Sequence, residues 1–196
     1  MITKYPRATI RFCIMFKPLI YFFFIGIVGA FSLALMNFVN TQYQFQFTLG
    51  DIVVTSMIYS VEIFVISTLI SAGLIHLIGK IFGGKGKFKQ MFSALCLTYI
   101  PFIWILPILL FWMQLSPESY FIIPGKVLTV GDQIMTFIGP ILIFLASVWS
   151  LFLIVKAIQE VQRLSMLRSV ISLLLLVVVI AILSIISLMM TGVSLI

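Results

Sequence analysis

Five long apolar runs follow one another along the chain, separated by short segments that hold most of its charges. Each run reaches about the 20 residues that a helix needs to cross a bilayer. The pattern therefore predicts an all-α polytopic membrane protein in which residues 1–196 form a single domain, a bundle of five transmembrane helices. The predicted spans are 19–38, 52–78, 91–113, 134–157 and 170–190.

Composition supports the membrane class. The chain is 63% hydrophobic and 9% charged, with a mean hydropathy of +1.30, values outside the range of soluble domains. The short connections leave no room for a sizeable soluble domain. Cys13, Cys96 and the single histidine form no metal-binding or disulfide pattern, so we predict no metal site and no cofactor.

Basic residues are concentrated in alternate connections, which indicates the orientation. The N-terminal segment holds four, the connection around 79–90 holds four and the connection after the fourth span holds three. The two remaining connections together hold only Lys126. The positive-inside rule then predicts that the N-terminus is cytosolic and the C-terminus outside.

Two segments outside the spans carry further expectations. Within residues 1–17, Arg7 and Arg11 would share one face of a short helix lying among the headgroups, with a plain charged flank as the alternative. The polar and aromatic segment 40–51 lacks lysine and arginine, so it is predicted to form an aromatic belt at the outer interface, with a short strand as the alternative.

The connection between the second and third spans combines glycines with lysines. The glycines permit a turn that other residues avoid, and the lysines keep that turn in water. One interpretation is a solvated loop that only orients two helices. The other is a binding surface for anionic lipid headgroups or an acidic partner, because each lysine near the surface adds about 1 kcal/mol to lipid binding. The candidate binding residues are Gly83, Gly84, Lys85, Gly86, Lys87 and Lys89.

Prolines interrupt the third and fourth spans. Pro101 and Pro107 each remove a backbone donor, so the third span is predicted to kink and to leave two carbonyls without helical partners. A hydroxyl, a neighbouring helix or water must satisfy such carbonyls at membrane depth, and Thr98 and Tyr99 are the nearest candidates. Pro140 marks a second candidate kink, near the outer end of the fourth span.

Glu62 is the one acidic residue deep within an apolar run. A carboxyl group there is a functional candidate, as a proton relay or cation ligand, unless it is satisfied structurally. We expect a neutral glutamic acid that is hydrogen-bonded to a hydroxyl of a neighbouring helix. His76 lies about 20 Å further along the same predicted helix, too far for a catalytic pair. We interpret it as a satisfied interfacial histidine.

The sequence resembles the bacterial members of a known family, the Yip1-domain proteins. The resemblance rests on FGGKGKFKQ at 82–90, followed by Tyr99-Ile100-Pro101. The segment 6–11 with Lys17-Pro18, and the stretch from Trp149 to Ser165, are also similar to the family. The resemblance implies a five-helix integral membrane protein without an established catalytic activity.

Family relatives suggest partners that differ between groups. Eukaryotic relatives act in Golgi and endoplasmic reticulum trafficking and bind small GTPases of the Rab type, whereas some bacterial relatives are associated with exporters or envelope stress. The GTPase role is not carried over, because the segment before the first span is short and basic. The resemblance thus implies a location in the cytoplasmic membrane of a bacterium. It also implies an exporter component as one candidate partner.

Three classes of function remain open. No metalloprotease, serine hydrolase or paired-carboxylate motif is present, so we predict no catalytic residue, and a membrane hinge is a poor site for nucleic acid. The leading hypothesis is a non-enzymatic scaffold or accessory protein that engages lipids or another membrane protein. The alternative is a small transporter or lipid-handling protein that uses the proline-broken spans and Glu62. An intramembrane enzyme is the third.

Overall fold

The computed structural model describes residues 19–39, 48–121, 127 and 129–192. Every element in these ranges is a helix, and five helical stretches are long and apolar enough to cross a membrane. The predicted all-α five-helix class is confirmed. The elements are α2 (Leu19–Met36), α3 (Leu49–Ile81), α4 (Phe88–Leu97), α5 (Ile100–Leu115), α6 (Pro117–Tyr120), α7 (Val130–Gln162) and α8 (Met166–Gly192).

The two longest helices, α3 and α7, begin in the same way. Thr48 caps α3 and Thr129 caps α7, and in each case an aspartate three residues later accepts a hydrogen bond from the cap's backbone N–H. Such a capping box satisfies donors that a helix start leaves unpaired. Both helices are 33 residues long, whereas the sequence predicts spans at 52–78 and 134–157.

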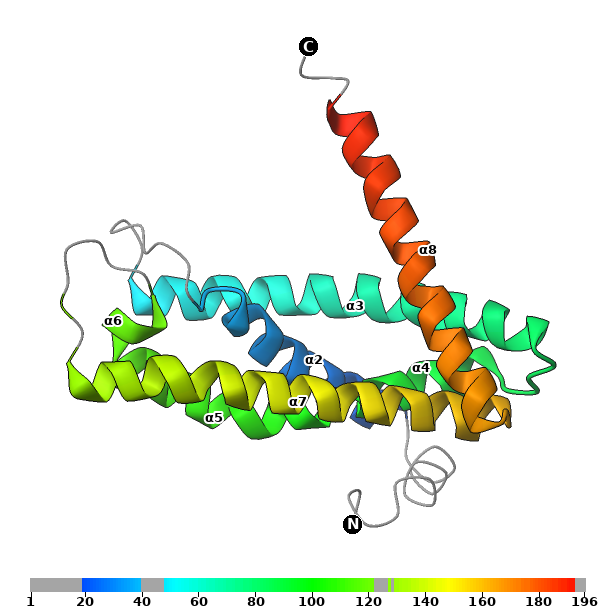
Figure 1. Ribbon diagram of the computed structural model, residues 1–196, viewed down its shortest axis with the longest axis horizontal. Coiled ribbons are helices and arrows are strands. Elements are labelled where there is room, and N and C mark those ends of the chain that lie inside the picture. The colour runs from blue at the N-terminus through cyan, green and yellow to red at the C-terminus, as the bar shows by residue number, and fades with distance from the viewer. Residues whose placement is uncertain (1–18, 40–47, 122–126, 128, 193–196) are drawn as a thin grey trace.

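Helices α3 and α7 run the length of the bundle, and α2, α4 and α5 pack against them (Figure 1). Helix α8 starts after a tight turn at the end of α7 and packs against α3 and α7. It then leaves the bundle at a steep angle (Figure 1). Within residues 166–186 of α8, whose burial is described, the buried residues lie near its start, for example Ser169, Ser172 and Leu176.

The third span differs from the prediction of a kinked helix. It is two helices, because α4 ends at Leu97 and α5 starts at Ile100, so Pro101 lies in the first turn of α5. A proline costs little there, because the first helical N–H groups have no intrahelical partner. The carbonyl of Thr98, at the break, accepts a hydrogen bond of 2.9 Å from Ser150 of α7. Pro107 and Pro140 lie inside α5 and α7.

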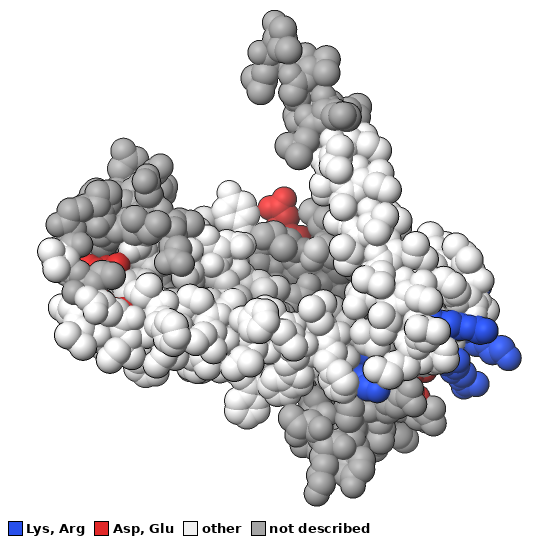
Figure 2. All heavy atoms as spheres, in the orientation of Figure 1, with Lys and Arg blue, Asp and Glu red and all other residues white. Residues whose placement is uncertain are grey.

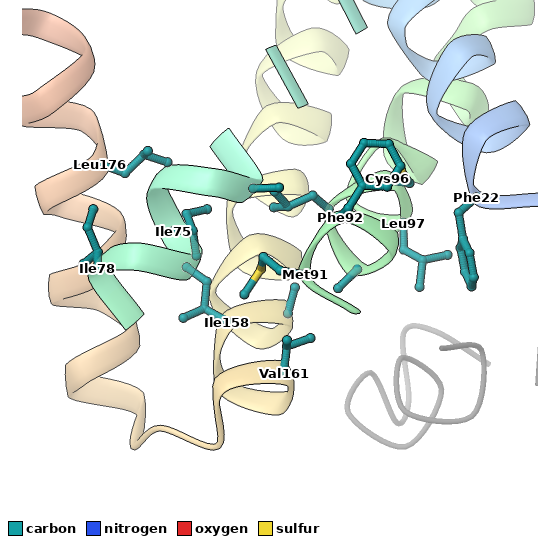
Figure 3. Packing of buried hydrophobic residues seen from close by; sticks show 14 of the residues in the cluster. Phe22, Ile75, Ile78, Met91, Phe92, Cys96, Leu97, Ile158, Val161 and Leu176 are labelled. Atoms are coloured by element: carbon teal, nitrogen blue, oxygen red, sulfur yellow. The ribbon is translucent and has the colours of Figure 1, made fainter. Parts of the chain in front are cut away.

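Two hydrophobic clusters form the core, one on each side of this break. In the first, Ile75 and Ile78 of α3, Met91 of α4, Ile158 of α7 and Leu176 of α8 converge (Figure 3). The second gathers around Trp112 and Leu109 of α5. Tyr99, at the break itself, packs against both clusters.

Two expectations fall on segments without a described structure. The proposed headgroup helix within 1–17 lies outside the described residues, as does most of the aromatic segment 40–51. Both stay predictions.

The described lysines and arginines lie at one end of the bundle, where the α3–α4 connection meets the α7–α8 turn (Figure 2). We call this the basic end; its described members are Lys80, Lys85, Lys87, Lys89, Lys156, Arg163 and Arg168. The capping aspartates of α3 and α7 lie at the opposite end. The described positive charges of the bundle are therefore concentrated at one end of its long axis. The positive-inside rule predicts that this end faces the cytosol.

We expect the basic end to face the cytosol, and cysteine labelling tests this. In a Cys13→Ser background, a membrane-impermeant maleimide should label Gln114→Cys and Gln133→Cys in intact cells, because both positions are exposed near the opposite end. Lys87→Cys and Arg163→Cys should label only after the cells are opened. Cys96 is buried and can stay in place. Labelling of the two basic-end positions in intact cells would show that the basic end faces outward.

Candidate functional site

The connection between α3 and α4 is a tight, ordered loop. Gly83 has a φ of +81°, a left-handed conformation that favours glycine, and it follows the last turn of α3 directly. The backbone N–H of Gly84 donates back to the carbonyl of Gly79 at 2.8 Å. On the other side, the N–H of Lys87 donates to the side chain of Gln90, which caps the start of α4.

Gln162, the last residue of α7, holds this loop at the point where the α3–α4 connection meets the α7–α8 turn. Its side chain is fully buried, and its Oε1 accepts a hydrogen bond of 3.2 Å from the N–H of Gly86. Its backbone carbonyl accepts another from the N–H of Lys85. Two consecutive loop residues are thus attached to one residue of α7.

The loop and the end of α3 lie so close to α7 that a side chain in place of their glycines would collide with it. A Cβ at Gly79 would lie 2.7 Å from Cδ of Gln162, and one at Gly84 would lie 2.4 Å from its Oε1. At Gly86 a Cβ would lie 2.6 Å from the carbonyl oxygen of Val161. We call Gly79, Gly84, Gly86 and Gln162 the glycine clasp. The glycines predicted as candidate binding residues at 84 and 86 are therefore occupied in packing.

His76 lies next to Gln162 of the clasp. Its Nδ1 lies 3.5 Å from Nε2 of Gln162, and its ring meets that of Phe88 edge-on at 6.3 Å between centroids. This arrangement agrees with the interpretation of His76 as a satisfied histidine.

The lysines of the loop, in contrast, project from the clasp. Lys85, Lys87 and Lys89 are exposed, as are Arg163 and Arg168 on the adjoining turn of α7 and α8. Arg163 ends α7 in a left-handed conformation, with a φ of 55°. Five cations therefore surround a loop whose backbone is fixed. Within the described part of the chain, no group of three metal-ligating side chains is found.

The break at Tyr99 opens onto a cavity of about 210 Å³ inside the bundle. Its walls carry the hydroxyl groups of Thr68, Ser71, Thr98, Tyr99 and Ser150 among apolar side chains. Oγ1 of Thr68 lies 3.2 Å from the phenol oxygen of Tyr99. Of the candidates, Tyr99 lines this cavity, Pro101 is buried in α5 without lining it, and Pro140 is exposed on the surface of α7.

Glu62 lies apart from both the clasp and the cavity. Its side chain is exposed on the surface of α3, although we expect a packed and hydrogen-bonded group from the sequence. The buried face of α3 instead presents neighbours such as Ser60 and Phe64 to the bundle. Toward the described residues, Glu62 makes no hydrogen bond or ion pair, so the expected hydroxyl partner is not found there.

Comparison with known proteins agrees with this architecture and with the glycine–lysine run. Residues 6–188 match the Yip1 domain. The chain belongs to the Yip1 family. The match includes all five candidate spans almost entirely, which confirms the resemblance at the level of the family. No curated protein and no solved structure gave a significant match. The bacterial origin expected for this Yip1 protein stays a prediction.

The opposite end of the Yip1 domain holds a buried polar network. Nε1 of Trp112 donates to Oγ of Ser119 at 2.6 Å, and the hydroxyl of Ser116 donates to the carboxylate of Asp132. Tyr120 donates to the carbonyl of Leu35, and burial raises the pKa of this phenol, which keeps its donor proton. These contacts fix α5, α6 and α7 together, so we assign the network a structural role.

Sequence reasoning misses Gln162 as a member of the site. It lies in a polar helix end with other glutamines and charges, where a solvated side chain is the ordinary expectation. Its pairing with a loop 76 residues earlier in the Yip1 domain has no local signal. The network around Asp132 does have one, because Thr129 and Asp132 form a Thr-x-x-Asp capping signature.

Proposed function

We propose that this Yip1-family membrane protein is a non-enzymatic accessory protein whose basic end binds anionic lipid headgroups. The proposal places that end at the cytosolic face of a bacterial cytoplasmic membrane. Recruitment of another membrane protein, such as an exporter component, would follow from this position. The family and the membrane-spanning helices support an accessory role in general.

One observation carries the proposal: the cations are exposed side chains on a backbone that is hydrogen-bonded to α7. Gln162 and the glycines of the clasp fix the loop, so the main chain that carries Lys85, Lys87 and Lys89 needs no further ordering on binding. Preorganisation of this kind reduces the entropy lost on binding. A purely solvated turn would not need a buried glutamine to hold it.

The cavity at Tyr99 supports a second candidate function, lipid handling. Its volume of about 210 Å³ is small for a drug-sized ligand but compares with apolar cavities that admit small hydrophobic molecules. Hydroxyl groups on its walls can hydrogen-bond an uncharged polar group at membrane depth. In this function the chain would bind part of a lipid inside the bundle.

A lipid-retention experiment tests the proposed headgroup binding. The full chain is purified in detergent with equal amounts of phosphatidylglycerol and phosphatidylcholine, and retained lipids are counted by native mass spectrometry. Wild type should prefer the anionic lipid, and Lys85→Gln/Lys87→Gln/Lys89→Gln should reduce that preference by about tenfold or more. High salt should have a similar effect, since the site is exposed.

Two matched variants complete the experiment. Lys156→Gln should change little, because Lys156 is half-buried, lies over the Phe152 ring and donates to Gln159. Ser71→Leu, which fills the cavity, should leave headgroup preference intact. If the triple variant retains the anionic preference, headgroup binding at the loop is wrong. If Ser71→Leu removes a retained lipid of either headgroup, lipid handling is favoured.

A further inference from the structure

Glu62 places a carboxyl group on the outer surface of α3 near the middle of the membrane. It is three residues, or about 4.5 Å of helix rise, from the midpoint of α3 at Val65. Val65 is also the midpoint of the apolar run 52–78. Because the hydrocarbon layer is about 30 Å thick, Glu62 lies well inside it.

The surface around Glu62 is a continuous stripe along one side of α3. Tyr59, Glu62, Ile66, Ile70 and Gly73 follow at spacings of three or four residues, so they share one helix face. The four side chains are exposed, and a Cβ added at Gly73 would meet nothing within 4 Å. We call these five residues the Glu62 face.

Such a placement is costly unless something outside the described chain compensates for it. Ionisable residues within membrane spans normally face the bundle interior or a water-filled cavity, where they pair with a polar group. Glu62 instead points away from the bundle and from the residues that line the Tyr99 cavity. Because the described residues offer no partner for its carboxyl group, we look for one in another molecule.

We propose that the Glu62 face docks a transmembrane helix of a different protein, which brings a lysine or arginine to the middle of the bilayer. Charge complementarity selects this occupant. The seven described lysines and arginines lie at the basic end, and the other five are at Lys126 and within residues 1–17. Among the described residues, a second copy would thus bring no cation to this depth, but another Glu62.

Helix α8 also brings no cation to this depth. Its one basic residue, Arg168, lies in its first turn at the basic end. Gly73 supports a helical occupant, because small residues let two membrane helices approach closely. The docking is separate from headgroup binding, so the lysine triple variant should leave it unchanged.

Defined peptides test the chemistry directly. The full chain in nanodiscs is mixed with a labelled single-span leucine–alanine peptide that carries one central lysine, or with a matched peptide that carries leucine there. Wild type should bind the lysine peptide about fivefold more tightly, the scale of a modest intramembrane polar contact. Glu62→Leu should abolish this difference while thermal stability is kept, because the side chain is exposed.

A relocated carboxylate provides the matched control. Glu62→Leu combined with Ile66→Glu moves the acid one turn along the same face and should restore part of the lysine preference. Equal binding of both peptides to wild type would overturn the proposal, as would an unchanged preference in Glu62→Leu. Self-association of the chain that depends on Glu62 would also overturn it in favour of a second copy.

Discussion

Replacing Gly29 by leucine is expected to destabilise the bundle by about 3 kcal/mol or more, at or beyond the upper end of usual overpacking costs. A Cβ at Gly29 of α2 would lie 2.5 Å from Cβ of Tyr99 and 2.8 Å from its carbonyl oxygen. These atoms belong to or adjoin the backbone at the α4–α5 break, so they cannot rotate away. The melting temperature in detergent should fall by about 6–12 °C.

Gly73→Leu is the matched control for Gly29→Leu. Both glycines lie in apolar membrane helices, but Gly73 has open space where its Cβ would be. The control should therefore melt within about 2 °C of wild type, as surface substitutions do. Equal losses in both variants would show that leucine is disfavoured for reasons other than the contact of α2 with Tyr99.

Gln162→Ala is expected to open the glycine clasp, at a cost of roughly 2–4 kcal/mol. Truncation leaves the N–H of Gly86 without its acceptor and leaves a hole against Gly79 and Gly84. Hydrogen exchange should report the change locally. The Gly86 amide should exchange at least about tenfold faster, whereas that of Lys85, which donates to the backbone carbonyl of residue 162, should change less.

Gln133→Ala is the control on the same helix, because Gln133 is exposed near the start of α7. It should leave exchange in the loop unchanged. If the Gly86 amide of Gln162→Ala exchanges as in wild type, the loop holds itself and Gln162 only fills space. The lysines would then lose the preorganised support that the proposed function assigns to them.

The number of spans follows from sequence because the membrane imposes a simple length requirement. Runs of about 20 apolar residues can hardly adopt another structure in a bilayer, since every backbone group must be satisfied internally. The helix starts at Thr48 and Thr129 are also recognisable locally as capping signatures. The division of the third span at Thr98 is harder to predict from the sequence, because a proline signals either a kink or a new helix start.

The faces of the helices are harder to predict than their positions. Lipid and bundle interior are both apolar, so a membrane helix lacks the polar outer stripe that orients a helix in a soluble protein. The sequence therefore indicates the depth of Glu62 in the membrane but not the side of α3 on which it lies. The expected hydroxyl partner in the bundle interior is not found among the described residues. Of the candidate lysines, Lys85 and Lys87 lie in the connection between α3 and α4, whereas Lys89 lies in the first turn of α4. Gln162 was reachable only through the tertiary structure.

The equal lengths of α3 and α7 have a consequence for the response to bilayer thickness. Each is about 50 Å long by helix rise, which exceeds the roughly 30 Å hydrocarbon layer by about 20 Å. A thicker bilayer can be matched by reduced tilt and a thinner one by increased tilt, at a small cost per ångström of mismatch. Because the clasp joins the ends of both helices, they must tilt together. The loop lysines would then stay at headgroup level in membranes of different acyl-chain length.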